Sequence, residues 1–271
     1  MTGAGAVAGR TAAGSGPAVA GAGEPFAGGR VLRAVTAELD AVRGRVSGRA
    51  PRVLDVGGGS GAWAVPLARS GCAVTVVDPS PNALASLRRR VREAGLADEL
   101  VTGVCGDVDA LDDVAAAGGA DLVLGHGLLE VVDDAEAAMR ALARAAAPGG
   151  AVSVLVAGRW AAVLARTLAG RIAEARAVLV GPDGRVGPGD ALRRRLDAAG
   201  LRSLLVGAGG LQVELVQGDG VLEGWVPGAV RDGGPAGIRA VEELEELAAA
   251  QGSLLDVAAR LHALGRRPTI G

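Results

Sequence analysis

Short apolar runs alternate with helical stretches between residues 52 and 157, and this alternation constrains the fold more than any other feature of the sequence. Runs with the length of buried strands occupy 52–56, 72–78, 99–106, 120–127 and 151–157. Helical spacing of apolar residues occupies 31–42, 62–70, 83–95 and 135–150. Strands that alternate with helices of about 10–15 residues indicate βαβ units, whose strands pair in a parallel sheet. The sequence therefore predicts an α/β fold.

The pattern is less regular beyond residue 157. It predicts two short helices in 159–179, a turn-rich loop at 181–190, a helix around 190–207, a strand at 211–217, a helix at 237–250 and a last strand at 259–267. The irregular stretches predict a helical cap in two parts, at about 158–195 and 218–258. The Gly/Ala-rich segment 1–27 has almost no charge and no period, so we expect a flexible tail outside one domain at 28–271.

The composition excludes several classes of function. All 28 basic residues are arginines, but 30 acidic residues give a net charge of −2, which does not attract DNA. Phe26 and three tryptophans are the only aromatic residues, so rows of stacked bases are excluded as a binding mode. Two distant cysteines in apolar runs fit neither a disulfide scaffold nor a zinc site, and no metal is expected.

The sequence predicts neither a membrane-spanning segment nor a signal peptide. No stretch reaches the ~18–20 apolar residues of a membrane span. The first residues lack both the basic start and the strong apolar core of a signal peptide. We therefore expect a cytoplasmic protein without a membrane partner, whereas its oligomeric state is left open.

The segment Asp55-Val56-Gly57-Gly58-Gly59-Ser60-Gly61 follows the first predicted strand and precedes a helix. Glycines allow positive φ and let the backbone approach a ligand closely, and the amides at a helix start can hold a polar group. Asp78 ends the next strand, 23 residues after Asp55, where a βαβ nucleoside site places its acceptor for the ribose hydroxyls. Together these residues predict a nucleoside cofactor. Gly57, Gly59 and Ala62 can also be aligned with a dinucleotide G-x-G-x-x-G pattern, so an NAD-dependent oxidoreductase is an alternative.

The D-x-G-x-G-x-G spacing of 55–61 resembles the first motif of the class I S-adenosylmethionine-dependent methyltransferases. Gly106-Asp107-Val108, the strand 121–126 and Pro148-Gly149-Gly150 match later motifs of that family in order, and the resemblance spans about 30–271. It implies a doubly wound Rossmann-like sheet of seven strands, mostly parallel, with the last strand antiparallel. It also implies S-adenosyl-L-methionine as cofactor and methyl transfer as the activity.

The same resemblance implies the residues that line the cofactor site. They are Asp55, Gly57, Gly58, Gly59, Asp78, Asp107, Val108 and His126. An arginine on the first helix, Arg30 or Arg33, would reach the cofactor carboxylate, and the sequence does not choose between them. His126 would contact the cofactor or, as a tentative catalytic residue, accept a proton near the methyl group, whereas His262 is expected to be structural.

The segment 126–134 resembles a stretch of the bacterial tRNA carboxymethoxyuridine methyltransferases and their relatives. This resemblance implies a small molecule or a modified tRNA base as the methyl acceptor. The arginine of a motif after the sixth strand has no counterpart in 218–222, so an anionic acceptor would need Arg159 or the run Arg193–Arg195 from the cap. A cofactor-binding partner protein without catalytic activity is a further alternative.

Overall fold

The computed structural model describes residues 29–231 and 234–269 and contains a seven-stranded sheet in the order β3-β2-β1-β4-β5-β7-β6. The strands are β1 (Arg52–Val56), β2 (Ala73–Asp78), β3 (Val101–Cys105), β4 (Ala120–His126), β5 (Ala146–Ala157), β6 (Gln212–Asp219) and β7 (Arg260–Arg266). Strands β1 to β5 pair in parallel, and β7 pairs antiparallel with both β5 and β6. The predicted mostly parallel sheet with an antiparallel last strand is therefore confirmed.

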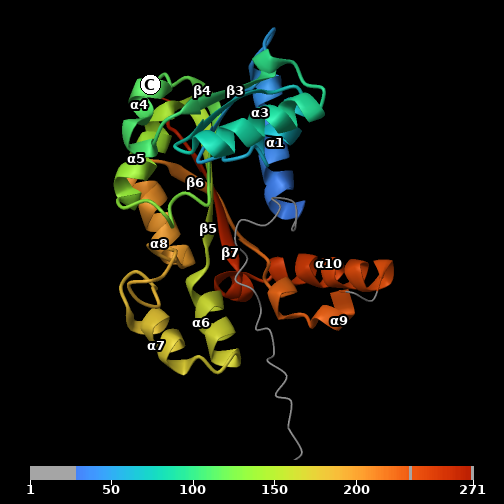
Figure 1. The fold of residues 1–271 in the computed structure, drawn as a ribbon, viewed down its shortest axis with the longest axis vertical. Helices are drawn as coiled ribbons and strands as arrows, with labels where there is room; N and C mark the ends of the chain where they lie inside the picture. Colours follow the sequence, from blue (N-terminus) through green and yellow to red (C-terminus); the bar gives the residue numbers. More distant parts are fainter. Residues whose placement is uncertain (1–28, 232–233, 270–271) are drawn as a thin grey trace, which may run out of the picture.

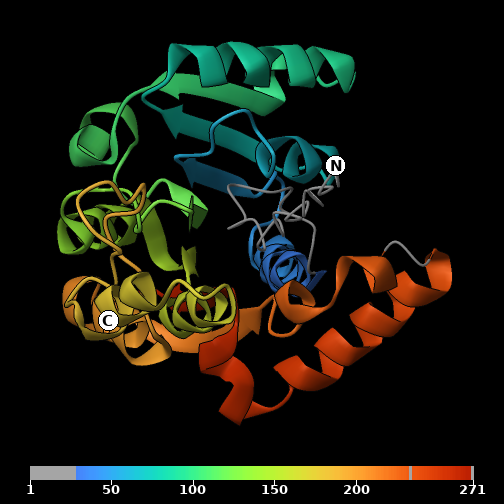
Figure 2. The same ribbon diagram turned by 60° about the horizontal axis from the view of Figure 1, so that its bottom comes forward.

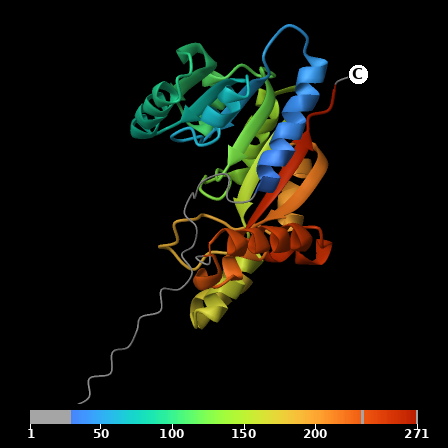
Figure 3. The ribbon, with the colours of Figure 1, turned by 90° about the vertical axis from the view of Figure 1, so that its right-hand side faces the viewer.

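Helices cover both faces of the sheet (Figure 1). One face carries α1 (Gly29–Arg45), α2 (Ala64–Arg69) and α3 (Pro81–Glu93), whose apolar side chains pack with those of β1, β2 and β4. The other carries α4 (Leu111–Val114), α5 (Ala135–Ala145) and α8 (Ala198–Ser203), which pack in a second core. Figure 3 shows α1 lying along the sheet beside β7. Aliphatic and alanine side chains make up both cores almost entirely, as the scarcity of aromatic residues requires.

Two helical pairs lie beyond the carboxyl end of β5 (Figures 1 and 2). Along the chain, helices α6 (Arg159–Leu168) and α7 (Ile172–Val180) follow β5. Helices α9 (Gly228–Arg231) and α10 (Pro235–Ala249) belong to the segment that connects β6 to β7. Short 3-10 helices occupy Asp98–Leu100, Val108–Ala110, Glu223–Trp225 and Gly252–Val257, and a π-helical turn occupies Leu204–Ala208. None of the helices in 29–231 and 234–269 is long and apolar enough to cross a membrane.

Two local predictions differ from the structure, and one short helix was missed. The helix expected around 190–207 begins only at Ala198, because the Asp190 carboxylate accepts hydrogen bonds from the Val186 and Leu192 amides and holds this part of the chain as a loop. The helix at 135–150 ends at Ala145, and Pro148–Gly150 belongs to β5. The single turn α4 was not expected at all. The predicted tail 1–27 lies outside the described residues.

Candidate functional site

The glycine-rich segment forms a tight turn between β1 and α2. Gly57, Gly59 and Gly61 have φ of 73°, 56° and 81°, a conformation that side chains with a Cβ rarely adopt. A Cβ on Gly58 would lie 2.3 Å from Oδ2 of Asp55, so the buried carboxylate packs directly under the turn. Glycine is therefore needed at these positions for the backbone to take this path.

Asp78 connects the end of β2 to the glycine turn. Its Oδ2 accepts a hydrogen bond from the Gly59 amide at 2.9 Å, and its Oδ1 accepts one from the Ser80 amide at 2.8 Å. The carboxylate is buried, and these two bonds fix its orientation. The predicted acidic residue and the predicted glycine turn thus meet at one edge of the sheet.

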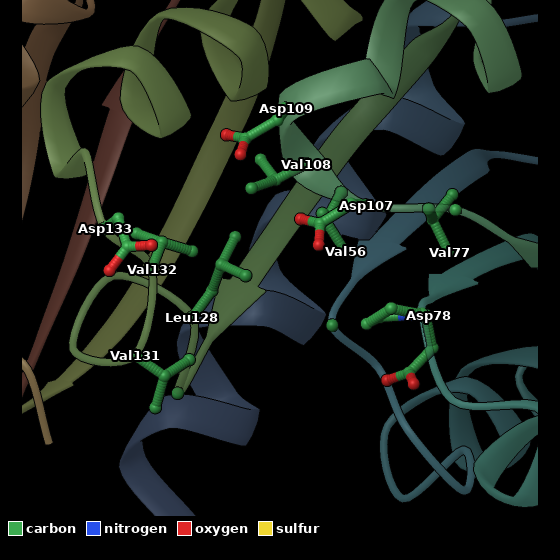
Figure 4. A pocket seen from close by; sticks show the side chains of 14 residues that line it. Val56, Val77, Asp78, Asp107, Val108, Asp109, Leu128, Val131, Val132 and Asp133 are labelled. Carbon is green, nitrogen blue, oxygen red and sulfur yellow. The ribbon is translucent and has the colours of Figure 1, made fainter. Parts of the chain in front are cut away.

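A cavity of about 330 Å³ opens at this edge (Figure 4). Four predicted residues line it, namely Gly57, Asp78, Asp107 and Val108. Its other lining residues are Val56, Val77, Pro79, Gly106, Asp109, Gly127, Leu128, Val131, Val132 and Asp133. Carboxylates accept hydrogen bonds from hydroxyl and amino groups, and the valines and Leu128 offer apolar surface to a flat ring. This combination suits a nucleoside.

Asp55 lies behind the turn as a buried acid. Its side chain is buried, with 2% of the residue surface exposed, and Oδ2 has no hydrogen-bond partner among the described residues. Burial, together with the negative charge of Asp78, raises the pKa of Asp55 to about 7. Asp55 therefore titrates near neutrality in the unliganded protein.

His126 ends β4, directly before the cavity residue Gly127. Its Nε2 lies 2.8 Å from Oγ of Ser153, and its ring stands edge-on to Trp63 at a centroid distance of 4.7 Å. Burial, and then the positive charges of His262 and Arg260, lower the pKa of His126 well below its usual value. An imidazole with a lowered pKa is neutral at physiological pH and is a weak proton acceptor.

Arg30 and Arg33, the two candidates for the cofactor carboxylate, share one partner in α10. Arg30 Nη1 donates to Oε2 of Glu246 at 2.9 Å, and Arg33 Nη2 donates to Oε1 of the same carboxylate. Neither belongs to the lining of the cavity. Both are thus placed to bind a carboxylate, and the structure shows them bound to one of the protein's own.

The cap arginines that were candidates for an anionic acceptor are hydrogen-bonded within the protein. Arg159 donates to backbone carbonyls of 178–182, at the end of α7. Arg194 donates to the carbonyls of Leu129, Val132 and Asp133. Arg195 is buried and pairs with Asp190. Arg194 thereby ties the cap to the loop that follows β4, whereas Arg159 and Arg195 hold parts of the cap to one another.

The loop after β4 supplies cavity residues that sequence reasoning missed. Asp134 caps α5, because its Oδ1 accepts a hydrogen bond from the Ala137 amide at 2.8 Å. Asp133 instead lines the cavity and pairs with Arg193 at 3.2 Å. The position of Asp133 in the sequence could have identified it, because it lies in the loop after a parallel strand, and loops at the carboxyl ends of such strands build the ligand sites of this architecture.

Comparisons with known proteins identify similar methyltransferases. Residues 53–150 match the family model described as a methyltransferase domain. The chain is 32% identical over 182 residues to the ubiquinone biosynthesis O-methyltransferase of Xanthomonas axonopodis pv. citri, covering 66% of this chain and 70% of that one. It is 29% identical to the tRNA 5-carboxymethoxyuridine methyltransferase of Escherichia coli over 44% of each chain. Two curated relatives are matched over less than half of their length, 41% and 44%.

A solved structure shows the same fold. The magnesium protoporphyrin IX methyltransferase of Synechocystis PCC 6803, solved with bound S-adenosylhomocysteine, superposes with a TM-score of 0.54 at 15% identity. The superposition covers 88% of this chain and 84% of that enzyme.

Proposed function

Because the chain belongs to the class I S-adenosylmethionine-dependent methyltransferases, we propose that it transfers the methyl group of S-adenosylmethionine to a small molecule. The residues around the glycine turn fit this cofactor. Gly57, Gly58 and Gly59 carry no Cβ atoms, so the backbone of the turn can approach a ligand closely, and the adjoining cavity offers carboxylates beside apolar side chains. Asp78, Asp107 and Val108 would hold the nucleoside, and Asp55, Gly57, Gly58 and Gly59 would form the floor under the cofactor.

The other end of the cofactor would lie toward α1. Buried polar atoms that have no hydrogen-bond partner among the described residues include Asp55 Oδ2, His126 Nδ1 and Arg30 Nε. Groups of this kind cost free energy until a ligand pairs with them. Arg30 or Arg33 would bind the carboxylate in place of Glu246, and His126 would lie beside it.

Methyl transfer makes few demands on protein side chains. When bound, S-adenosylmethionine supplies a methyl group already activated by a positively charged sulfur. Alignment of the acceptor with that group then provides much of the rate. The residues named above would therefore act by binding and orientation, and the cap by covering the site.

We favour a small molecule over tRNA as the acceptor because the cap arginines are already hydrogen-bonded within the protein. Binding of tRNA relies on cationic side chains that neutralise phosphates and on rings that stack with bases. Arg159, Arg194 and Arg195 are instead engaged with carbonyls and with Asp190. The curated relative matched over 70% of its length is an O-methyltransferase of ubiquinone biosynthesis, which supports a small acceptor.

Calorimetry with S-adenosylhomocysteine and with NADH tests the cofactor. We expect S-adenosylhomocysteine to bind and NADH not to bind. Asp78→Ala should weaken binding by about 1–3 kcal/mol, since it removes an acceptor for the ribose and for the Gly59 amide. Asp98→Ala, on an exposed 3-10 helix, is the matched control. Binding of NADH alone would contradict the proposal.

Transfer of a labelled methyl group to panels of small molecules and of bulk tRNA tests the acceptor. Labelling of a small molecule and not of tRNA is the expected result. Labelling of tRNA alone would replace the small-molecule proposal. Tight cofactor binding with no transfer across a broad panel would favour a non-catalytic partner protein.

A further inference from the structure

A row of polar side chains crosses four strands beneath α1. Gln217 of β6, His262 of β7, Ser153 of β5 and His126 of β4 follow one another from the edge of the sheet inward. The distances are 2.9 Å from Gln217 Nε2 to His262 Nδ1, 2.8 Å from His262 Nε2 to Ser153 Oγ, and 2.8 Å from Ser153 Oγ to His126 Nε2. Ser153 and His262 have 0% of their surface exposed and Gln217 has 9%. Solvent therefore does not reach the row between its ends.

The backbone of α1 sets the direction of these hydrogen bonds. Nε2 of Gln217 also donates to the Arg30 carbonyl at 3.3 Å, so the amide nitrogen faces two acceptors. The reversed amide would place its oxygen against the carbonyl oxygen, which is repulsive. His262 Nδ1 thus accepts and its proton is on Nε2, which donates to Ser153. The Ser153 hydroxyl then donates to Nε2 of His126, which leaves the proton of His126 on Nδ1.

The charges around the row keep both rings neutral. Burial lowers the pKa of His262 to about 4. Burial lowers the pKa of His126 well below its usual value, and the positive charge of Arg260, also on β7, lowers it further. Trp63, the residue directly before α2, stands edge-on to the ring and carries no charge. His126 therefore holds a single proton at neutral pH.

The end of the row has a donor without an acceptor. His126 Nδ1 is buried and has no hydrogen-bond partner among the described residues. The next residue, Gly127, lines the cavity, and the other end of the row meets α1, where the Arg30 carbonyl accepts a hydrogen bond from Gln217. A ligand that fills the cavity and extends toward α1 would meet this N–H group.

We propose that His126 is a neutral Nδ1–H donor to the carboxylate end of the bound cofactor, and that Gln217, His262 and Ser153 are positioning residues that fix this tautomer. The inference rests on the proposed cofactor site, and it assigns His126 to binding and not to proton abstraction. Ser153, His262 and Gln217 act only through His126.

Nitrogen-15 NMR tests the tautomer without any ligand. The chain has only two histidines, so a histidine-labelled sample of the full protein gives two imidazole spin systems, which His126→Asn assigns. We expect His126 in the Nδ1–H form and His262 in the Nε2–H form at pH 7. Ser153→Ala should turn His126 into a mixture of tautomers. An Nε2–H form or a protonated ring at His126 in the unmodified protein would overturn the proposal.

A matched pair of variants tests the donor. The side-chain amide of His126→Asn places an N–H near the position of Nδ1, whereas that of His126→Gln reaches toward Nε2 and Ser153. We expect His126→Gln to weaken binding of S-adenosylhomocysteine about tenfold and His126→Asn to restore most of it. Binding of methylthioadenosine, which lacks the amino-acid part, should be the same in both variants.

The outcomes separate the two proposals. Equal losses for both ligands, or no loss for either, would overturn the role of His126. If the unmodified protein bound neither ligand, the proposed function would fail, while the NMR result would still report whether the row fixes the tautomer.

Discussion

At the scale of one residue, the ionisation of the buried Asp55 carboxyl lowers the stability of the folded protein. The pKa of its carboxyl is about 7 in the folded protein, against about 3.9 in an unfolded chain. Between these values the folded protein keeps a proton that the unfolded chain releases. The free energy of unfolding therefore falls as pH rises from about 4 to about 7 and levels off above that. Asp55 therefore lowers the stability of the folded protein at neutral pH and not in acid.

Asp55→Asn should make the protein more stable at pH 8 by roughly 4 kcal/mol and should have little effect at pH 4, because the amide cannot ionise. Denaturant unfolding at the two pH values measures the difference. Glu130, whose pKa burial also raises to about 7, contributes a trend of the same sign, so Glu130→Gln is the companion variant. A loss of stability at pH 8 in Asp55→Asn would show that the carboxylate is satisfied when ionised.

At the scale of elements, α10 connects two distant parts of the chain through adjacent residues. Glu245 is buried and accepts backbone hydrogen bonds from Val221, Leu222 and Glu223, after β6. Glu246 binds Arg30 and Arg33 at the start of α1. A cofactor carboxylate that bound either arginine would compete with Glu246 for it.

Glu246→Gln should therefore tighten binding of S-adenosylhomocysteine by about two- to fivefold, since the neutral amide competes less well for the arginines. Calorimetry checks this, with the exposed Glu243→Gln on the same helix as control. Weaker binding in Glu246→Gln would mean that Glu246 orients the arginines and does not compete for them.

At the scale of the whole molecule, the folded unit is predicted to begin at residue 28. Removal of residues 1–27 should leave both the thermal midpoint and the affinity for S-adenosylhomocysteine unchanged, because the α1 face is packed from Val31 onward. Thermal unfolding and calorimetry on the shortened chain check this. A large loss of either would place the N-terminal segment within the functional unit.

Most of the sheet could be predicted because its strands are short apolar runs, and buried strands leave that pattern in a sequence. The glycine turn and Asp78 could be found because their spacing repeats a known geometry. The helices of the cap could be predicted as well, but the course of its loop around Arg194 could not, because that loop depends on contacts such as Arg194 with Leu129, far apart in the sequence. The row of polar side chains that contains both histidines could not be predicted either. His126 and His262 share it only because β7 inserts beside β5, a pairing that no local pattern indicates.

The placement of the three tryptophans gives the protein built-in optical reporters. Trp63 touches the ring of His126, Trp160 lies in α6 beneath the Arg159 guanidinium at 5.3 Å, and Trp225 lies between β6 and α9. With no tyrosine in the chain, the emission excited near 280 nm comes from these three rings. One sits beside the site and the other two in the cap. Single replacements by phenylalanine would therefore separate the fluorescence signal of ligand entry from that of cap movement, with no attached dye.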